Sequence, residues 1–390
     1  MLLYLSLIAF PMQAMQLPEL SQYGLRGYAP PGSVHEPEIH VLARSSIHRL
    51  YVAPGGADEN PGSVWQPFRT LARADRAAVP GTTVYVAPGV YEGGFQTRSS
   101  GSAGARIVYI SSTRWGARIV PPAQGSRHAA WDNRASNVDI VGFDVDGSAH
   151  QTGTRWRHGI YSSGSYNTIR RNRVHHIARD IACTSAGGSA IGIDGYYRGV
   201  ESEVLGNLVH DIGPPGCRFV QGIYVSTSAQ VKYNVVYRVS EGAIHLWHDA
   251  RNVVIANNTV SASNTGIIVG GGDFYHARGP NDHTVVVNNI VYDNAVGISE
   301  QGATGKNNRY RYNLVAYNRK MNWQLKRGMR HEKTISADPR LLGDARSGMA
   351  DLRPAQGSPA LGRGHPQFAE GSDFEGRPRS GAVDIGAYQR

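Results

Sequence analysis

The chain has 390 residues, 47 of them glycine, and its formal net charge is +10 at pH 7. This length exceeds one ordinary globular core, but a repeat fold that grows along one axis can use all of it as a single body. The scarcity of helix-favouring runs argues against an α-helical protein, and the absence of any recognition module argues against a nucleic-acid partner.

The N-terminal segment is predicted to direct export. Residues 2–10, LLYLSLIAF, form an apolar run that is too short to span a bilayer, and Ala14 stands where a signal peptide could be cleaved. We therefore expect a signal peptide over residues 1–15, an N-terminal extension over residues 16–48, and a secreted or periplasmic protein. We find no other stretch that is long and apolar enough for a membrane span.

Residues 67–79, PFRTLARADRAAV, form the one convincing amphipathic helix of the sequence. Phe68, Leu71, Ala74 and Ala78 fall on one face of this predicted helix. A stack of strand coils exposes unpaired strand edges at its ends, and such ends need to be covered. We therefore predict that this helix caps the N-terminal end of the fold.

An asparagine-based repeat occupies the middle of the chain. The pattern Asn-x-(Val) recurs at intervals of 24 to 35 residues, and the longer intervals contain insertions rich in glycine and proline. A period in the twenties with many β-branched residues indicates stacked strand coils, and the leucines that mark leucine-rich repeats are absent. We predict an all-β, single-stranded parallel β-helix over residues 49–334, with an asparagine at each bend bonded to the coils above and below. The asparagines of the repeat are Asn172, Asn207, Asn234, Asn258, Asn289 and Asn313.

The two cysteines of the chain occupy similar places in successive coils. Cys183 lies shortly after Asn172, and Cys217 lies at nearly the same distance after Asn207. If these asparagines are equivalent, the two thiols lie in stacked loops and can form a disulfide, as an oxidising compartment would favour. The alternative is two unrelated thiols.

Both ends of the repeat resemble known proteins. The stretch YVAPGGADENPGSVWQPFRTLARA, which begins at Tyr51, is similar to the opening segment of many secreted β-helix proteins, including polysaccharide lyases. The tail, with DPRLLG and DFEGRPRSGAVDIGAYQR, resembles the closing segment common in the same group. The resemblance implies a right-handed β-helix and identifies residues 335–390 as a C-terminal closing segment.

Successive coils carry a repeated isoleucine followed by a variable residue. Strand alternation turns the next residue outward if the repeated isoleucines point inward, namely Ile160, Ile193, Ile223, Ile244, Ile267 and Ile298. Neighbouring coils are ~5 Å apart, so four consecutive polar groups would span a few sugar units. This predicted outer column reads Tyr161, Asp194, Tyr224, His245, Ile268 and Ser299.

A second outward column follows the Asn-x-Val motif and is rich in histidine. It reads Asp146, His175, His210, Tyr237, Ser261 and Tyr292. We prefer the first column as the active face, because Tyr196, Arg198, Trp247, His248 and Asp249 follow its members, and aromatic rings and arginines suit acidic sugars. In a regular strand His175 and His176 would point to opposite faces, so we predict no metal site there.

The residues of the first column suit β-elimination of a uronic acid polymer. This reaction needs a base beside the carboxylate, a group that neutralises the carboxylate, and an acid for the leaving oxygen. We assign Tyr224 and His245 as the base and acid pair, with Asp194 and Tyr161 completing the catalytic set. Arg157 or Arg198 would neutralise the carboxylate, while Tyr196, Trp247, His248 and Asp249 would bind the sugars. The abundant arginine fits either an anionic partner or an ordinary soluble surface.

Residues 224–258 resemble the central coils of the chondroitinase B and alginate lyase family. That family has a catalytic lysine in the segment matching STSA and an arginine just before the histidine that matches His248. Here Ser228 and Trp247 stand in those two places, and the calcium-binding acids of the family have no clear counterparts. The calcium-assisted mechanism of that family therefore does not transfer to this chain. We expect no cofactor, and a calcium requirement is the one alternative left open.

Three other functions remain compatible with the sequence. A uronate C5-epimerase starts with the same proton abstraction. A glycoside hydrolase needs two carboxyls, which Asp194 with Glu241, Asp249 or Asp273 could supply. A non-catalytic glycan-binding protein would use the column for binding alone. In each case we expect an acidic polysaccharide partner, no nucleic acid, and a monomeric chain.

Overall fold

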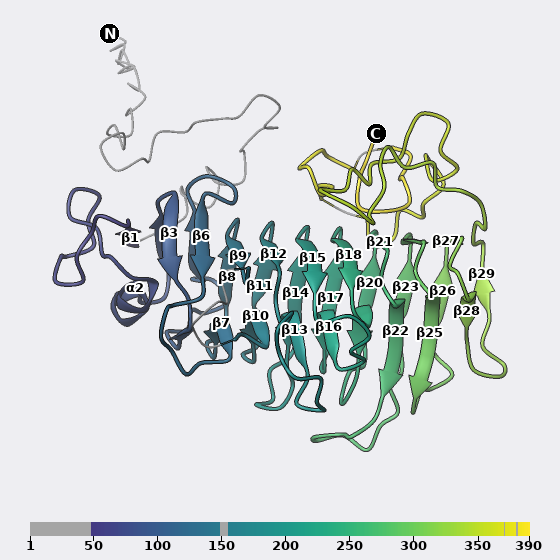
Figure 1. Cartoon of the computed structure of the whole chain (residues 1–390), viewed down its shortest axis with the longest axis horizontal. Helices are drawn as coiled ribbons and strands as arrows, with labels where there is room; N and C mark the ends of the chain where they lie inside the picture. Colours follow the sequence, from purple (N-terminus) through teal and green to yellow (C-terminus); the bar gives the residue numbers. More distant parts are fainter. Residues whose placement is uncertain (1–47, 149–154, 370, 380) are drawn as a thin grey trace, which may run out of the picture.

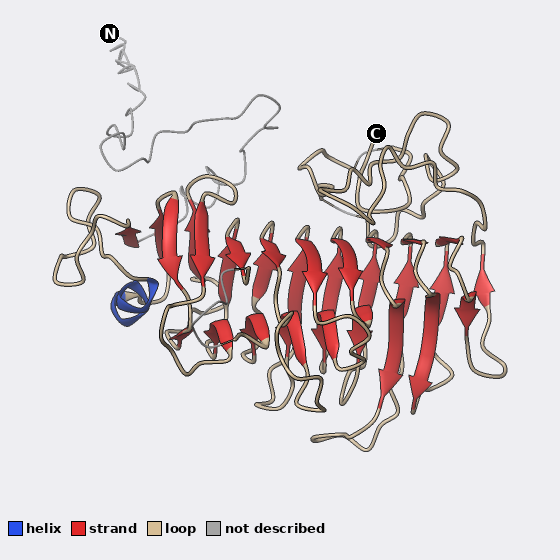
Figure 2. Cartoon of the chain, viewed as in Figure 1, coloured by secondary structure: helices blue, strands red, loops and turns tan. Residues whose placement is uncertain are grey.

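The computed structural model describes residues 48–148, 155–369, 371–379 and 381–390 (Figure 1). The predicted signal peptide, and the predicted extension up to residue 47, lie outside the described residues. Within the described part, three long parallel sheets run side by side along one axis, and a single helix lies at one end (Figure 2). The chain is a right-handed parallel β-helix, as predicted from the sequence.

Each complete turn of the helix contributes one strand to each sheet, and an incomplete turn at either end adds one further strand to sheet A. Every strand pairs in parallel with its equivalent in the next coil. Sheet A contains β1 (His48–Val52), β2 (Thr82–Val86), β5 (Ile107–Ser111), β8 (Val138–Val141), β11 (Thr168–Arg170), β14 (Ser202–Leu205), β17 (Ala229–Lys232), β20 (Val254–Ala256), β23 (Val285–Val287), β26 (Arg309–Arg311) and β29 (His331–Glu332). Sheet B contains β3 (Gly89–Glu92), β6 (Ala117–Val120), β9 (Asp144–Asp146), β12 (Arg173–His175), β15 (Leu208–Ile212), β18 (Val235–Val239), β21 (Thr259–Ser261), β24 (Ile290–Tyr292) and β27 (Leu314–Ala316). Sheet C contains β4 (Phe95–Thr97), β7 (Ala129–Asn133), β10 (His158–Ser162), β13 (Gly188–Ile193), β16 (Val220–Val225), β19 (Gly242–Leu246), β22 (Thr265–Gly271), β25 (Val296–Gly302) and β28 (Met321–Gln324).

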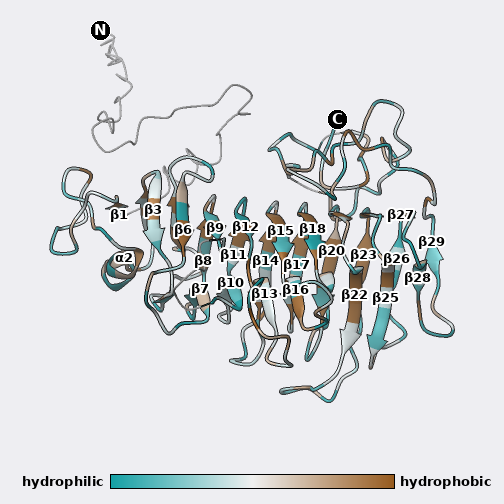
Figure 3. Cartoon of the chain, viewed as in Figure 1, coloured by the Kyte–Doolittle hydropathy of each residue, from teal (hydrophilic) through white to brown (hydrophobic). Residues whose placement is uncertain are grey.

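The core is a set of apolar stacks, because equivalent residues of successive coils lie directly above one another. In sheet C, Ile191, Ile223, Ile244 and Ile267 are register partners in turn, and all are buried. Hydrophobic residues accordingly line strands such as β20, β22 and β23 (Figure 3). Stacking identical side chains removes their apolar surface from water in every coil at once, at ~25 cal/mol per Å² of area buried.

The predicted asparagine ladder is present and continuous. The backbone N–H of Asn207 donates to Oδ1 of Asn234 at 2.9 Å, and the N–H of Asn234 donates to Oδ1 of Asn258 at 2.9 Å. Each side-chain amide also donates to a carbonyl of the preceding coil, as Asn234 does to Val204 at 2.9 Å. The same pattern extends from Asn172 to Asn313, and every side chain in it is buried. The ladder satisfies backbone groups at a corner where strand pairing is interrupted.

The predicted capping helix is shorter than expected. Helix α2 (Leu71–Ala77) begins four residues later than the amphipathic pattern, because Thr70 caps it by accepting the N–H of Arg73 at 3.1 Å. The carboxylate of Asp58 fixes this turn by accepting from Thr70 N and Thr70 Oγ1. Phe68, Leu71, Ala74 and Ala78 are nevertheless all buried against the first coils, which confirms the cap.

The C-terminal segment lies along the side of the β-helix (Figure 1). Phe374, Ala387 and Tyr388 pack with Leu208, Val235 and Tyr237 of sheet B. Farther along, Ile385 and Ala360 pack against Ile290, Leu314 and Ala316. Backbone groups of the tail also bond to the repeat; for example, Gly386 N–H donates to Asn288 O and Ala387 N–H donates to Thr259 Oγ1. The tail therefore covers the outer face of sheet B from β15 to β27 rather than only the last coil.

Cys183 and Cys217 form a disulfide, as the spacing suggested. Cys217 is buried and Cys183 is exposed, so the bond joins a surface loop between β12 and β13 to the loop before β16. The two cysteines are 34 residues apart in sequence.

We predict that Asn234→Ala will destabilise the protein by about 3 kcal/mol, because it leaves buried N–H and C=O groups of neighbouring coils unpaired. The shift should appear as a lower midpoint in urea unfolding followed by circular dichroism. Asn264→Ala is the matched control, since Asn264 is exposed and its side chain donates only to Glu241. Equal midpoints for the two variants would contradict a structural role for the ladder.

We predict that reduction of the disulfide will lower the free energy of unfolding by about 3–4 kcal/mol, because the bond restricts a loop of this length in the unfolded chain. The test compares urea midpoints of the native protein, the reduced protein and the Cys183→Ser/Cys217→Ser double variant. A midpoint that does not change on reduction would show that the bond contributes nothing to stability.

Candidate active site

The outer column of sheet C is real, but one of its predicted members is wrong. Ile160 pairs with Ile191 and not with Ile193, so Gly192 takes the place that was assigned to Asp194. Ile191 and Ile193 point to the same side of the strand. Moving the alignment by two residues therefore leaves the same side chains facing outward, and the sequence pattern cannot distinguish the two alignments. The actual column reads Gln96, Asp132, Tyr161, Gly192, Tyr224, His245, Ile268, Ser299 and Gln324.

Asp194 nevertheless points outward. It directly follows β13, two residues after Gly192, and so lies on the same face as the column. Oδ2 of its carboxylate accepts a hydrogen bond from the Tyr161 hydroxyl, and Oδ1 accepts from Ser226 Oγ at 2.7 Å and from Tyr196 N at 3.1 Å. Its exposed fraction is 9%. The structure thus brings two predicted catalytic residues, Tyr161 and Asp194, into direct contact.

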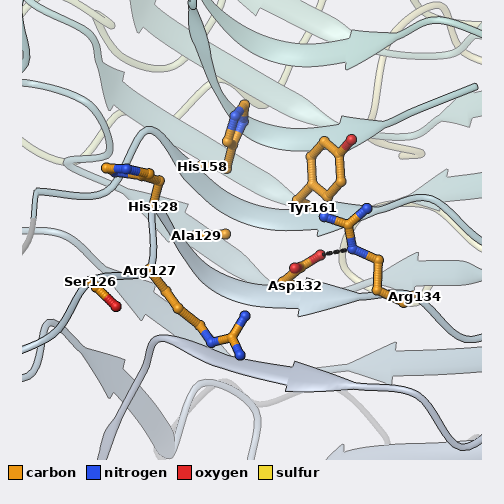
Figure 4. A pocket seen from close by; sticks show the side chains of 8 residues that line it. All are labelled: Ser126, Arg127, His128, Ala129, Asp132, Arg134, His158 and Tyr161. Carbon is orange, nitrogen blue, oxygen red and sulfur yellow. Dashed lines mark ion pairs between the residues drawn. The ribbon is translucent and has the colours of Figure 1, made fainter. Parts of the chain in front are cut away.

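Two clefts adjoin on this face of the molecule and together form the groove. The N-terminal cleft has a volume of about 600 Å³ and is lined by Ser126, Arg127, His128, Ala129, Asp132, Arg134, His158 and Tyr161 (Figure 4). The central cleft has a volume of about 590 Å³, and its lining includes His158, Tyr161, Gly192, Asp194, Arg218, Tyr224, His245, Trp247, His248, Asp273 and Tyr275. His158 and Tyr161 belong to both clefts, so the groove continues from one to the other across β10.

Arg134 is a cation at this junction. Its guanidinium carbon lies 5.0 Å from the centre of the Tyr161 ring, and its Nε lies 2.6 Å from Oδ1 of Asp132 (Figure 4). Burial lowers the pKa of Arg134, but the hydrogen bond and charge of Asp132 outweigh it and hold that pKa above its usual value. Oδ2 of Asp132 accepts from Gln96 Nε2 at 2.6 Å, so both oxygens of this carboxylate are engaged.

Tyr161 and His158 are both neutral at neutral pH. Burial and the neighbouring Asp194 carboxylate raise the pKa of the Tyr161 hydroxyl, which Arg134 offsets only in part. Burial lowers the pKa of His158 to about 4. Nδ1 of His158 lies 3.1 Å from Ser189 Oγ, and its ring centre lies 5.2 Å from that of Tyr161.

Tyr224 and His245 lie on the other side of Gly192, with their rings nearly perpendicular and 5.4 Å apart. Burial first, and then Tyr275, Asp194 and Asp273, raise the pKa of Tyr224, which is opposite to the lowered pKa that a Tyr224 base needs. Burial lowers the pKa of His245 to about 3. Both ring nitrogens of His245 are covered and have no hydrogen-bond partner among the described residues. His245 therefore presents ring surface to the groove rather than proton-transferring atoms.

The loop between β22 and β23 forms one wall of the central cleft. The carboxylate of Asp249 accepts the backbone N–H groups of Tyr275, His276 and Ala277, so Asp249 positions this loop instead of lining the cleft. The ring of His248 stacks on Tyr275 at 3.9 Å. Trp247 lies beneath Gly270 and Gly272. A Cβ on either glycine would come within 2.8 Å of the Trp247 ring.

The predicted arginines are not the ones that line the groove. Arg157 donates to the carbonyl of Gly187 at 3.2 Å and so supports the 185–188 loop, and Arg198 lies on an exposed turn. Neither they nor Tyr196 belong to the lining of either cleft in the described part of the chain. Instead, the rings of Tyr196 and Tyr275 are perpendicular to each other, with their centres 5.3 Å apart.

Sequence reasoning missed Arg127, Asp132, Arg134 and His158. Asp132 could have been predicted from the sequence. Trp131 occupies the inward position of the preceding coil, where it pairs with Ile160, and Asp132 is the next residue. A search for repeated isoleucines passes over a tryptophan in that place. Extending the column by one coil would have found Asp132 directly, with Arg134 two residues later on the same strand face.

The second column lies on sheet B with the register that the sequence predicts, from Asp146 through His175 and His210 to Tyr237. The prediction that His175 and His176 point to opposite faces is wrong. His176 has a left-handed backbone (φ 56°), and this bend brings its Nδ1 within 2.7 Å of Nδ1 of His175.

No helix in the described part of the chain is both long and apolar enough to cross a membrane.

Comparison with known proteins agrees with the architecture. A family described as a protein of unknown function, DUF1565, matches residues 54–97. The uncharacterized protein YwoF of Bacillus subtilis (strain 168) is 30% identical over 149 residues, which is 37% of this chain and 31% of that protein. Pectate lyase L of Dickeya dadantii (strain 3937) is 28% identical over 189 residues, which is 44% of this chain and 43% of that protein. The chain thus matches less than half the length of these curated relatives.

Among solved structures, the pectate lyase Pel9A superposes with a TM-score of 0.59 at 16% identity, covering 89% of this chain and 97% of that one. A glycoside hydrolase superposes with a TM-score of 0.53 at 9% identity, covering 74% and 95%. At these identities the likeness concerns the fold. The chain therefore has the parallel β-helix architecture that pectate lyase Pel9A also has.

Proposed function

We propose that this protein is a polysaccharide lyase that binds an acidic polysaccharide in the groove and cleaves it by β-elimination. The observation that carries the proposal is the contact of Arg134 with Tyr161, whose hydroxyl bonds to Asp194 at the junction of the two clefts. The likeness to pectate lyases in fold, and to pectate lyase L over part of the sequence, supports the substrate class.

The shape and lining of the groove suit an extended chain of charged sugars. It runs across successive coils, so sugar units can follow one another along the molecular axis. Arg127 and Arg134 in the N-terminal cleft and Arg218 in the central cleft provide guanidinium groups, which pair well with carboxylates. The rings of Tyr224, Trp247 and Tyr275 offer apolar faces on which sugars pack.

The reaction requires a carboxylate-binding cation and a base close together, because the acidic C5–H of a uronate is on the carbon that carries the carboxylate. Arg134 and Tyr161 meet this requirement. In this proposal a uronate carboxylate bound to Arg134 presents C5 to the Tyr161 hydroxyl oxygen. The guanidinium then stabilises the charge that develops on the carboxylate as the proton leaves.

Tyr161 acts as the base through Asp194. As its oxygen takes the C5 proton, its own proton moves to the Asp194 carboxylate, so no free phenolate has to exist at neutral pH. The C–H electron pair forms the C4=C5 double bond, and the C4–O bond breaks. The proton held by Asp194 returns through Tyr161 to the leaving oxygen. Both side chains thereby regain their starting state.

Elimination fits the carboxylates of the groove better than hydrolysis does. A hydrolase needs one carboxyl that donates a proton and a second that assists water or the sugar. Asp132 is paired with Arg134 and Gln96, while Asp194 accepts three hydrogen bonds. Of the partners weighed for Asp194, Asp249 is engaged by the loop, and Asp273 accepts from Trp247 Nε1 at 3.3 Å. Glu241 accepts from Asn264, and burial raises its pKa, but it does not line either cleft. The carboxylates that do line the clefts are hydrogen-bond acceptors.

We predict that Tyr161→Phe will lower kcat by a factor of 100 or more, because it removes the proton-transferring oxygen while keeping the ring. The assay follows the ultraviolet absorbance of the new C=C–COO⁻ group on a panel of uronate polymers. Tyr166→Phe is the matched control, since Tyr166 is exposed and outside both clefts. Wild-type activity in Tyr161→Phe would show that Tyr161 is not the base. New reducing ends without ultraviolet absorbance would indicate a hydrolase. Inversion at C5 without cleavage would indicate an epimerase.

We predict that Arg134→Gln will lower kcat/KM by a factor of 100 to 1000 on a free uronate polymer, because the carboxylate loses its neutralising partner. On the methyl-esterified polymer the wild-type enzyme and the variant should differ far less. Arg319→Gln, at an exposed site away from the groove, serves as the control. An equal loss on both polymers would show that Arg134 supports folding or general binding rather than the carboxylate.

A further inference from the structure

A second cluster of chemically active side chains lies on the outer face of sheet B. Asp146 on β9 and His175 on β12 are register partners, and His176 follows directly after β12. His176 adopts a left-handed backbone, so its ring turns toward that of His175 instead of to the opposite face. One nitrogen of each histidine and one oxygen of Asp146 all lie within 4.8 Å of one another.

The neighbouring residues orient His175 with a lone pair toward this cluster. Its Nε2 lies 3.0 Å from Oδ1 of Asp144, a carboxylate that Arg173 holds with bonds of 2.6 and 2.7 Å. Because a carboxylate held this way accepts hydrogen bonds, the proton of the His175 ring is on Nε2, and Nδ1 carries a lone pair. That Nδ1 faces Nδ1 of His176 at 2.7 Å and Oδ1 of Asp146 at 3.5 Å.

We infer that Asp146, His175 and His176 bind a divalent transition-metal ion of the zinc type. Two imidazole nitrogens and a carboxylate oxygen are the ligands that zinc takes, with water completing four positions. The hydrogen bond from His175 to Asp144 is the outer-shell contact that typically orients a metal-bound histidine. Calcium prefers six to eight oxygen ligands, which this cluster does not offer.

Little movement is needed to admit the ion. Zn–N distances of ~2.0–2.1 Å place two nitrogens of a tetrahedral site ~3.3 Å apart, whereas the two Nδ1 atoms are now 2.7 Å apart. His176 is only partly buried, so its ring can shift by this amount. With the His175 Nδ1 lone pair as acceptor, the ion takes the place of the proton on Nδ1 of His176.

The ion belongs with Asp146 rather than with the next coil. His210 and Asp211 also lie near His176, but Nδ1 of His210 is bonded to Asp211 at 2.7 Å. Arg238 bonds both oxygens of the same Asp211 carboxylate, at 2.7 and 2.8 Å. In Asp146, Arg118 pairs with Oδ2 alone, and Oδ1 accepts from Ser148 N at 2.7 Å, so Oδ1 keeps a lone pair near His175. The site therefore joins β9 to β12 on sheet B, while the groove lies on sheet C, and it does not depend on the proposed lyase activity.

The test uses the full chain, stripped with EDTA and dialysed into metal-free buffer, and adds Zn²⁺ or Co²⁺ alone. We expect one equivalent of metal by mass spectrometry, a visible d–d spectrum of tetrahedral Co²⁺, and a rise in Tm with Zn²⁺. His176→Gln and Asp146→Asn should weaken binding at least tenfold and abolish the rise in Tm. His283→Gln is the control, because that side chain is 63% exposed on another part of the surface.

Three results would overturn the inference. The first is no bound metal and no Co²⁺ spectrum in the wild-type chain. The second is unchanged metal affinity in His176→Gln. The third is loss of binding in Asp211→Asn with retention in Asp146→Asn, which would place the ion on the next coil. Because the comparison uses the rise in Tm on adding metal, a variant that only lowers the metal-free Tm does not imitate the expected result.

Discussion

The buried asparagine ladder is the constraint on which the rest of the structure depends. At its corner the chain turns from sheet A to sheet B, and the residue before each ladder asparagine adopts a left-handed backbone, as Arg171, Tyr233 and Tyr312 do. The amide side chains supply the hydrogen bonds that strand pairing leaves unmade there. Because each asparagine contacts the equivalent residue of the next coil, the coils cannot slide relative to one another. Every outward column inherits this fixed register.

The groove follows from that register together with one local irregularity. Stacked coils hold Asp132, Tyr161 and Tyr224 in line at the ordinary strand spacing, and Gly192 leaves a gap between the two tyrosines. Asp194 reaches the Tyr161 hydroxyl because it lies two residues beyond Gly192 along the chain, on the same face. Loops that differ from coil to coil then build the walls, so the scaffold is repetitive while the site is not.

Most of the architecture could be predicted from the sequence, because repeated residues such as Asn234 and Ile223 report directly on what is stacked and buried. The site could be predicted only in part. The sequence Ile191-Gly192-Ile193 allows two registers with the same face, and Trp131 hides the coil that carries Asp132 and Arg134. The turn at His176 depends on a backbone angle that strand alternation cannot foresee. The role of Asp249 depends on a loop whose path no repeat encodes.

The C-terminal segment changes how the molecule holds together. In a simple solenoid each coil touches only its neighbours, so folding can start anywhere and ends can fray independently. Here one segment contacts Arg114 and Leu208 in early and middle coils and Leu314 near the last coil. Distant coils are thereby tied through a strap that follows all of them in the chain. A nascent β-helix would remain unclasped until this segment leaves the ribosome, after which the whole rod should behave as one cooperative unit.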